Sequence, residues 1–203
     1  MTDTTRFDQA AATWDREERR VLLARGVAAA IAARVPLTPK MKVLDFGCGT
    51  GLVTLELGPK VGSITGADTS TGMLATLTEK AAAQGITLEL KPLGSDGLAD
   101  LGGPYDLIVS SMTLHHIADV PALFRRFLQH LAPGGQVALA DLDEEDGSFH
   151  EDTAGVHHQG FSRKTIETWL KTAGFGQIQV ETAMITSKAG TDYPVFLATA
   201  RRS

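Results

Sequence analysis

From residue 40 onward, the chain alternates short runs of β-branched and apolar residues with segments of good helix formers. We expect strands at residues 41–46, 62–68, 86–91, 105–111 and 136–142. We expect helices between them at residues 51–58, 72–84, 120–131 and 162–173. The last strands, 175–186 and 193–200, have no helix between them and should form an antiparallel hairpin. This order predicts an α/β fold: a doubly wound, seven-stranded, mostly parallel sheet with a C-terminal antiparallel hairpin.

The chain of 203 residues is the size of a single domain with a large core. Residues 1–35 are rich in helix formers and should form an N-terminal helical extension, which Pro36 and Pro39 end. We therefore expect an extension at 1–35 and a ligand-binding domain at 36–203. Ligands of such sheets bind at the carboxyl ends of the strands, so residues that follow strands are the first candidates for a site.

Composition excludes several classes of protein. The chain has 19 Lys and Arg against 24 Asp and Glu, a formal net charge of −5, which argues against a general nucleic-acid binder. The single cysteine, Cys48, rules out an intramolecular disulfide framework. The first 20 residues are polar and do not resemble a secretory signal, and charges interrupt the apolar stretch at 21–35. These features predict a cytoplasmic location, no membrane insertion and no nucleic-acid partner.

The first predicted strand ends in a glycine-rich turn, VLDFGCGTG, with glycines at 47, 49 and 51. Such a turn lets the backbone approach a ligand closely. The spacing differs from the dinucleotide pattern, because Leu52 stands where its third glycine would fall. Asp45 at the mouth of the turn would repel a pyrophosphate, and Asp68 after the second strand suits a ribose diol. The two acids favour a nucleoside with a cationic tail, and S-adenosylmethionine (SAM) fits that description.

The turn resembles motif I of the class I SAM-dependent methyltransferases. The likeness continues through ADTSTGML, YDLIVSSMTLHHI, LAPGGQVALADL and YPVFLATAR, over about residues 40–200. It is nearest to the small-molecule branch related to the quinone-biosynthesis methyltransferases. The resemblance implies a Rossmann-like SAM-binding methyltransferase domain, with SAM as cofactor and S-adenosylhomocysteine (SAH) as product.

Carried over by position, the resemblance implies a set of cofactor contacts. Those at the amino-acid end of SAM are Asp45, Gly47, Cys48 and Gly49. Asp68 would hold the ribose, with Thr69 and Met73 beside the adenine and either Ser95 or Asp96 near its amino group. Ser110 and Ser111 would line the methyl-donor region. The pairs Phe7-Asp8 and Trp14-Asp15 match a lid pattern that would place Trp14 over SAM; the alternative is that both rings only pack on the core.

Methyl transfer is an in-line displacement, and a protonated acceptor also needs a general base. Histidine is the natural candidate. His115 and His116 follow the fourth strand, and in the resembling family one such histidine usually has a structural role. His157 and His158 lie in the loop after the fifth strand, where they either face the acceptor or orient the next helix. We take His157, His158 and His116 as the catalytic candidates.

A metal site is an alternative function for the loop after the fifth strand, because His150, His157 and His158 lie near an acidic run at 141–146. The spacing matches no standard ligand motif, so we predict no metal.

The sequence as a whole predicts a SAM-dependent methyltransferase that acts on O, N or C of a small molecule. The alternatives are another SAM-using enzyme, of the aminopropyl or carboxyl transfer type, and a non-catalytic SAM- or nucleoside-binding regulatory protein. A regulatory protein would have the space beside the methyl group filled by side chains. An RNA or protein methyltransferase is disfavoured, since SSMT at 110–113 replaces the Asn/Asp-Pro-Pro-aromatic tetrad of many amino-nitrogen methylases. The oligomeric state stays open, with a homodimer as one option.

Overall fold

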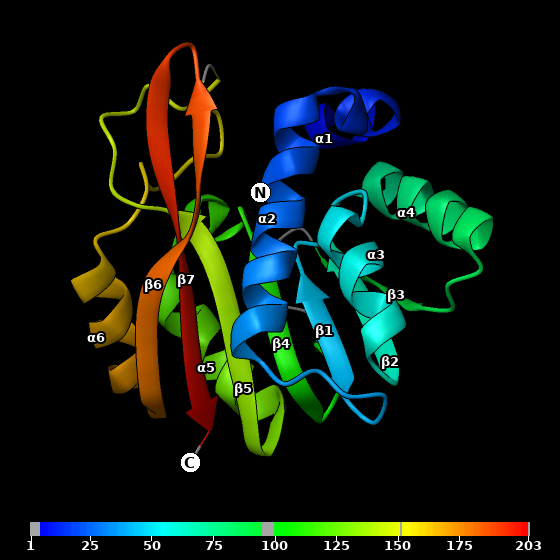
Figure 1. Cartoon of the computed structure of the whole chain (residues 1–203), viewed down its shortest axis with the longest axis vertical. Coiled ribbons are helices and arrows are strands. Elements are labelled where there is room, and N and C mark those ends of the chain that lie inside the picture. The colour runs from blue at the N-terminus through cyan, green and yellow to red at the C-terminus, as the bar shows by residue number, and fades with distance from the viewer. Residues whose placement is uncertain (1–4, 95–99, 151, 203) are drawn as a thin grey trace.

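The computed structural model describes residues 5–94, 100–150 and 152–202. Seven strands form one sheet in the order β3-β2-β1-β4-β5-β7-β6 (Figure 1). Their bounds are β1 Lys42–Phe46, β2 Ser63–Asp68, β3 Glu89–Pro92, β4 Tyr105–Ser111, β5 Leu131–Leu142, β6 Phe175–Lys188 and β7 Thr191–Arg202. Neighbours from β3 to β5 pair in parallel, whereas β7 lies antiparallel between β5 and β6. The predicted fold class, including the terminal hairpin, is confirmed.

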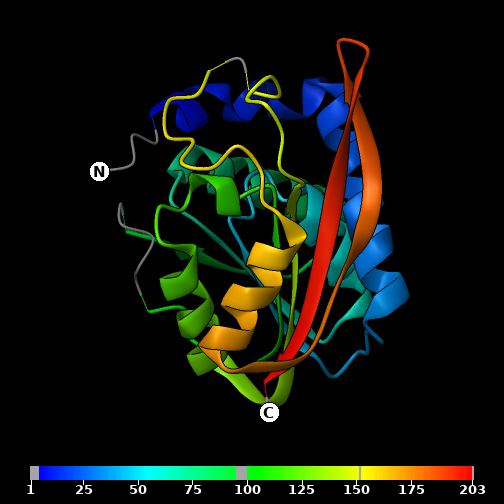
Figure 2. The same ribbon diagram turned by 90° about the vertical axis from the view of Figure 1, so that its left-hand side faces the viewer.

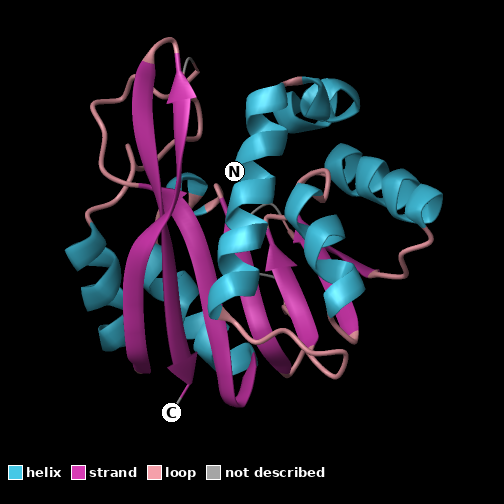
Figure 3. Cartoon of the chain, in the orientation of Figure 1, coloured by secondary structure: helices cyan, strands magenta, loops and turns pink. Residues whose placement is uncertain are grey.

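Helices cover both faces of the sheet (Figure 3). Their bounds are α1 Thr5–Ala10, α2 Glu18–Arg34, α3 Leu52–Leu57, α4 Thr71–Gln84, α5 Val120–His130 and α6 Arg163–Ala173, with short 3-10 turns at η1 Ala11–Arg16, η2 Gly58–Lys60 and η3 Leu114–His116. Local sequence sets several of these ends. Ser162 caps α6 by accepting a hydrogen bond from the backbone of Thr165, and Gly174 ends it in the left-handed region at φ 105°.

Alternate side chains of each central strand pack into two separate cores. In β1, Val43 faces the core beneath α2 and α3, whereas Leu44 faces the core beneath α5 and α6. Both side chains are buried, as are Ile31 of α2 and Phe127 of α5. Burial of one such side chain contributes roughly 1.5–3 kcal/mol to stability. Helix α2 is thus part of the core, while α1 and η1 cross the carboxyl ends of the strands (Figures 1 and 2).

Several boundaries differ from expectation; strand β3, for example, begins at Glu89 rather than at residue 86. Strand β5 begins at Leu131, which pairs with Tyr105 ahead of an irregularity in the register, so Pro133-Gly134-Gly135 lies inside the strand segment rather than in a loop. The β6–β7 hairpin is longer than predicted, and its tip rises beyond the end of β5 (Figure 1). Figure 2 shows this tip gathered with the loop after β5 and the N-terminal segment at one end of the molecule.

No helix within residues 5–94, 100–150 and 152–202 is long and apolar enough to cross a membrane.

Candidate active site

A cavity of about 560 Å³ lies at the carboxyl ends of the strands. One end is lined by residues that follow β1 and β2, and the other by the start of α2, the loop after β5 and the end of β6. The size is typical of a pocket for a cofactor-sized ligand. We call the first part the cofactor end and the second part the acceptor end.

The glycine turn after β1 forms the floor of the cofactor end. Gly47, Gly49 and Gly51 have φ values of 70°, 53° and 81°, a region that favours glycine. A Cβ on Gly47 would lie 2.3 Å from atoms of Thr113, so close packing also demands glycine there. The backbone N–H groups of Gly47 and Cys48 donate to the carbonyl oxygen of Ala67 at 2.8 and 3.1 Å. The turn is therefore fixed against β2 while its inner side borders the cavity.

The two predicted acids lie in this end of the cavity; Asp45 is buried and Asp68 is partly buried. Thr54 Oγ1 donates to Asp45 Oδ2 at 2.6 Å. Burial, together with repulsion from Asp68, nevertheless raises the pKa of Asp45 to about 7. Burial also raises the pKa of Asp68, although its oxygens accept hydrogen bonds from the backbone of Gly49 (2.8 Å) and of Ser70 (2.9 Å).

The donor set fits SAM. Each Asp68 oxygen has lone-pair capacity left for a ribose hydroxyl, and the Asp45 carboxylate lines the cavity, where a ligand's positive charge would favour its ionised form. A Cβ on Gly49 would meet nothing within 4 Å, so there is open space beside the turn. The cofactor residues predicted from the sequence that line the cavity are Trp14, Asp45, Gly47, Cys48, Gly49, Asp68, Thr69, Met73 and Ser111.

Three predicted cofactor residues are placed differently or not at all. Ser110 is buried and its hydroxyl donates to the carbonyl oxygen of Phe46 at 2.8 Å, so it supports the sheet and does not line the cavity. Ser95 and Asp96 lie outside the described residues. Cys48 is buried, and burial raises the pKa of its thiol, so the reactive thiolate form is scarce at neutral pH.

The N-terminal segment lies over the cofactor end and is bonded to it at two points. Asp8 accepts hydrogen bonds from the Ser70 hydroxyl (2.6 Å) and the Gly72 backbone (2.9 Å), and these bonds lower its pKa. Asp15 accepts from the Thr50 hydroxyl at 2.6 Å and pairs with Lys80 at 2.5 Å. The segment is thus tied both to the glycine turn and to the start of α4.

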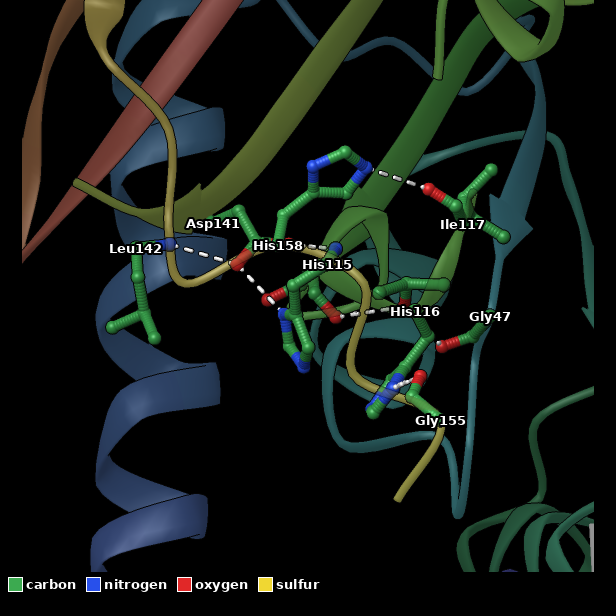
Figure 4. Close-up of polar contacts among 10 residues, drawn as sticks. Gly47, His115, His116, Ile117, Asp141, Leu142, Gly155 and His158 are labelled. Carbon is green, nitrogen blue, oxygen red and sulfur yellow. Dashed lines mark hydrogen bonds and ion pairs between the residues drawn. The ribbon is translucent and has the colours of Figure 1, made fainter. Parts of the chain in front are cut away.

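His115 of η3, which lines the cavity, is paired with Asp141 near the end of β5 (Figure 4). Its Nδ1 lies 2.8 Å from Asp141 Oδ1, and both side chains are buried. Because a carboxylate only accepts, Nδ1 carries a hydrogen, and in the neutral form of the ring Nε2 has the lone pair. Burial alone would raise the pKa of Asp141, but His115 and the backbone N–H groups of Leu142 and His115 hold it below its usual value. The carboxylate therefore stays ionised and orients the ring.

Two more imidazoles flank His115 in the cavity lining. The ring centroids of His116 and His150 lie 4.2 and 4.6 Å from that of His115. Burial, with repulsion from His115, lowers the pKa of each to about 4, so both are neutral at pH 7. His116 Nδ1 donates to the carbonyl oxygen of Gly155 at 2.8 Å, and Phe7 of the N-terminal segment packs edge-on against its ring. Nε2 of His150 is buried without a partner among the described residues.

His157 and His158 do not line the cavity. Their backbone N–H groups donate to the carbonyl oxygen of His115 at 2.8 and 3.3 Å, and His158 Nε2 bonds to the carbonyl oxygen of Ile117 at 3.0 Å (Figure 4). The side chain of His158 packs against Phe161, and His157 is exposed. Both residues hold the loop after β5 onto η3, and their catalytic role stays a prediction.

The described residues contain no group of three or more His, Cys, Asp or Glu side chains arranged to hold a metal ion. The acids of the run at 141–146 are used within the chain instead. Asp143 pairs with Arg163 through two bonds of 2.9 and 2.6 Å. Glu145 accepts from the backbone of Gly147 and Phe149 at 2.9 and 3.1 Å. These contacts shape the loop that carries Phe149 and His150 into the cavity.

Sequence reasoning missed most of the acceptor end. The residues it did not single out are Arg6, Arg19, Arg20, Phe149 and Lys188. It named Asp141 only within an acidic run. A usable signal existed for Asp141, because an acid near the end of a buried strand, with a histidine after the neighbouring strand, predicts a pair at one sheet edge. For the other five residues, no pattern in the sequence indicates that they lie at one site.

The comparisons with known proteins agree with this site. The sequence pattern of the methyltransferase-domain family matches residues 16–180. An uncharacterized methyltransferase of Schizosaccharomyces pombe is 31% identical over 156 residues, 69% of this chain and 55% of the relative. The biotin biosynthesis bifunctional protein BioCD of Bordetella avium is 37% identical over 151 residues, 72% of this chain and 31% of that protein. The chain thus spans about a third to a half of the length of these relatives.

Among solved structures, a methyltransferase of Haloferax volcanii in complex with the Trm112 activator has a TM-score of 0.76 at 19% identity, with 97% of each chain covered. Phosphoethanolamine N-methyltransferase 2 of Haemonchus contortus, bound to SAM, has a TM-score of 0.70 at 20% identity, covering 86% of this chain and 52% of that one. These likenesses concern the fold. With the match to the family pattern over residues 16–180, they leave one assignment: the chain belongs to the methyltransferase-domain family, as a class I SAM-dependent member.

Proposed function

We propose that this chain transfers a methyl group from SAM to an oxygen, nitrogen or carbon atom of a small molecule. The observation that carries the proposal is that one cavity is lined both by Asp45 and Asp68 at its cofactor end and by His115, which the buried Asp141 holds from behind. A non-catalytic binding protein would need no open space beyond the cofactor. Here the cavity continues past the glycine turn to His150 and Phe149.

We assign the proton-accepting role to Nε2 of His115. Asp141 holds the ring in one tautomer and stabilises the positive charge that the ring gains when it takes the acceptor's proton. When bound, SAM supplies an electrophilic methyl group, and its sulfur leaves as SAH with the electron pair of the broken C–S bond. His116, one of the catalytic candidates from the sequence, lies beside His115, and Phe7 packs against its ring. We assign it a positioning role. The N-terminal segment at 5–16 excludes water from the cavity.

Small-molecule acceptors agree with the relatives. The wheat relative, 31% identical over 150 residues, is named a phosphoethanolamine N-methyltransferase, and a Rhizobium relative, 28% identical over 103 residues, is named a ubiquinone biosynthesis O-methyltransferase. The cytoplasmic location, the absence of a nucleic-acid partner and a homodimer stay predictions from the sequence.

The test is an acceptor screen. The purified chain is incubated with SAM and a panel of metabolites that carry hydroxyl, amino or carboxyl groups, and SAH formation is measured beside mass spectrometry of the products. A product heavier by one methyl group, with matching SAH, is the expected result. Transfer of an aminopropyl or carboxyl-bearing group would identify the other SAM-using class. Tight SAM binding without any transfer would identify a regulatory protein.

Histidine variants refine the assignment. We expect His115→Gln to reduce turnover by about a hundredfold or more, in the range typical of a lost general base. His157→Gln should change turnover little, because only the backbone of His157 contacts His115. If His157→Gln or His158→Gln lowered turnover as strongly while SAM affinity stayed constant, the catalytic prediction for that loop would replace the assignment to His115.

A further inference from the structure

Phe149 closes the acceptor end of the cavity on the side of the β6–β7 hairpin. Its side chain lines the cavity and is 5% exposed. The ring of His150, which also lines the cavity, lies 5.0 Å from that of Phe149, edge to face. The ring of Tyr193 in β7, which belongs to the core beneath α2 and α3, lies 5.1 Å from it in the same arrangement. Phe149 is therefore the wall between the cavity and that core.

The wall is fixed both from the loop after β5 and from the hairpin. Within the loop, Glu145 Oε2 accepts the backbone N–H of Phe149 at 3.1 Å. From the hairpin, Lys188 Nζ donates to the carbonyl oxygen of Phe149 at 2.6 Å, and the hydroxyls of Ser148 and Tyr193 are 2.7 Å apart. A side chain whose backbone is held from two directions keeps its position when a ligand presses on it.

Helix α2 closes the remaining side of the ring. Near the start of the helix, the guanidinium carbon of Arg19 lies over the Phe149 ring, 4.9 Å from its centroid. Further along, Gly26 lets the helix approach the hairpin closely, because a Cβ there would lie 2.4 Å from the sulfur of Met184 in β6. The ring is thus packed between the loop, the hairpin and the helix, and it cannot swing aside to admit a longer ligand.

The position of the wall along the sheet edge favours the acceptor over the cofactor as the molecule that meets it. Three strand spacings separate β1, which carries the glycine turn, from β7, so these strands are about 14 Å apart. His115, after β4, lies between them. The ring of His150 fills the interval, 4.6 Å from that of His115 and 5.0 Å from that of Phe149. A molecule whose nucleophile lies at His115 therefore reaches Phe149 after the width of a single ring.

We propose that Phe149 determines the size of the acceptor: the cavity admits a flat apolar body of one ring between His115 and Phe149, and Phe149 excludes a second ring attached to the first. This proposal rests on the proposed methyltransferase function. Aromatic side chains pack favourably on planar ligands, and Phe149 and His150 both line the cavity where such contacts would form. The acceptor class is therefore a single-ring compound whose nucleophile points to His115 and whose far edge meets Phe149.

The experiment compares phenol with 4-phenylphenol, which carries a second ring opposite the hydroxyl group. Binding of both to the full chain saturated with SAH is measured by calorimetry and by NMR shifts of the histidine rings. We expect phenol to bind the unaltered chain at least about tenfold more tightly than 4-phenylphenol, because a packed wall penalises a group for which it leaves no room. Saturable shifts at His115 and His150 should accompany phenol binding.

Substitution of the wall should remove this preference. Phe149→Ala leaves a space in front of Tyr193, so 4-phenylphenol should bind this variant at least about tenfold more tightly than it binds the unaltered chain. Phe149→Leu removes less volume and should act in the same direction, and it takes the place of the alanine variant if that variant does not fold. Phe175→Ala is the matched control, because Phe175 is also 5% exposed but lies in the core beneath α5 and α6. It should leave the ratio of the two affinities unchanged.

Three results would overturn the proposal: equal affinity of the unaltered chain for the two probes, no saturable binding of phenol, or an unchanged ratio of affinities in both Phe149 variants. A loss of SAH affinity of about tenfold or more in Phe149→Leu would also overturn it, because the cofactor rather than the acceptor would then lie against the ring. The proposed function is checked separately by titration of SAM into the unaltered chain. SAM binding without the size preference overturns only the acceptor class, whereas failure to bind SAM overturns the proposed function itself.

Discussion

The two ends of the cavity are built in different ways. The cofactor end comes from two short stretches of chain, 43–51 and 64–69, whose residues are fixed by bonds between neighbouring strands. The acceptor end collects side chains from the N-terminal segment, η3, the loop after β5 and the end of β6. A cofactor end built from a glycine turn suits a ligand that is the same in all proteins of this fold. An acceptor end built from loops can differ between such proteins, because loops vary without a change of fold.

The two ends also handle their acids differently. At the cofactor end, burial raises the pKa of Asp45 and Asp68, so negative charge is costly until a cation arrives. Near the acceptor end, Asp141 stays ionised because His115 donates to it. Asp45 and Asp68 have no cationic partner among the described residues until the cofactor binds, whereas Asp141 is already paired with His115. Changes at the two ends should therefore separate cofactor binding from turnover.

The largest expected effect is on turnover, from Asp141→Asn. The amide cannot hold His115 Nδ1–H in the same way or stabilise the charged ring, so we expect turnover to fall by about a hundredfold or more. The dissociation constant for SAM should change less than twofold. Steady-state kinetics, a pH–rate profile and SAM calorimetry measure the separation.

Asp146→Asn, an exposed change in the loop that follows β5, is the control for that variant. A fall in turnover that came with a much lower melting temperature and an unchanged pH–rate profile would show that Asp141 acts only in folding.

The next effect is on cofactor affinity, from Asp68→Asn. The change removes a charged acceptor for the ribose and weakens the bonds to the backbone of Gly49 and Ser70. Hydrogen bonds to charged groups contribute about 1.5–3 kcal/mol, which corresponds to a loss of roughly tenfold to a hundredfold in SAM affinity. Turnover at saturating SAM should persist. An equal loss of turnover would contradict the separation.

A moderate effect is expected from pH. Asp45 has a pKa of about 7 before ligand binds, and SAM should favour its ionised form. SAM affinity should therefore fall by up to tenfold per unit as pH drops below about 7 and level off above it. Calorimetry from pH 5.5 to 8.5 checks this, and Asp45→Asn should remove the dependence. A flat profile in the unaltered chain would show that Asp45 does not ionise on binding.

The same shift affects stability without ligand. A carboxyl whose pKa is raised on folding holds its proton in the native state at pH values where the unfolded chain has lost it. The contribution of Asp45 to the free energy of unfolding should therefore decrease as pH rises from about 4 to about 7. Denaturant melts across that range measure it, with Asp45→Asn as the reference.

The smallest effect is expected at the N-terminal segment. Asp15→Asn weakens the contacts with Thr50 and Lys80, a partly exposed pair of the kind that contributes about 0.2–1 kcal/mol. We expect SAM to dissociate up to about fivefold faster, as measured by stopped-flow fluorescence of Trp14. Deletion of residues 1–16 with unchanged SAM binding would show that Phe7 and Trp14 only pack on the core.

The sequence was sufficient for the fold and for most of the cofactor end, because both depend on short-range patterns. Alternating strands and helices define the sheet, and positive-φ glycines with Asp45 and Asp68 lie within a few residues of strand ends. Where prediction missed a boundary, as at Leu131, a pairing with Tyr105 decided it, and local propensity does not show such pairings.

The acceptor end could not be read in the same way. Lys188 reaches Phe149 only because the β6–β7 hairpin is long, and Arg19 reaches it because the start of α2 lies over the sheet edge. His157 and His158 looked more suited to catalysis than His115, yet the loop turns their side chains away from the cavity and His115 inward. These placements follow from the tertiary fold of loops, which residue type and spacing do not determine.

The central claim is that SAM occupies the β2 side of one cavity and leaves the β5–β6 side for the acceptor. A crystal structure of the full chain with SAH tests it most directly. The account predicts the ribose hydroxyls within hydrogen-bonding distance of Asp68 and the sulfur facing His115, with open space left between the cofactor and Phe149. A cofactor that lay against Phe149, or that filled the space in front of His115, would contradict it.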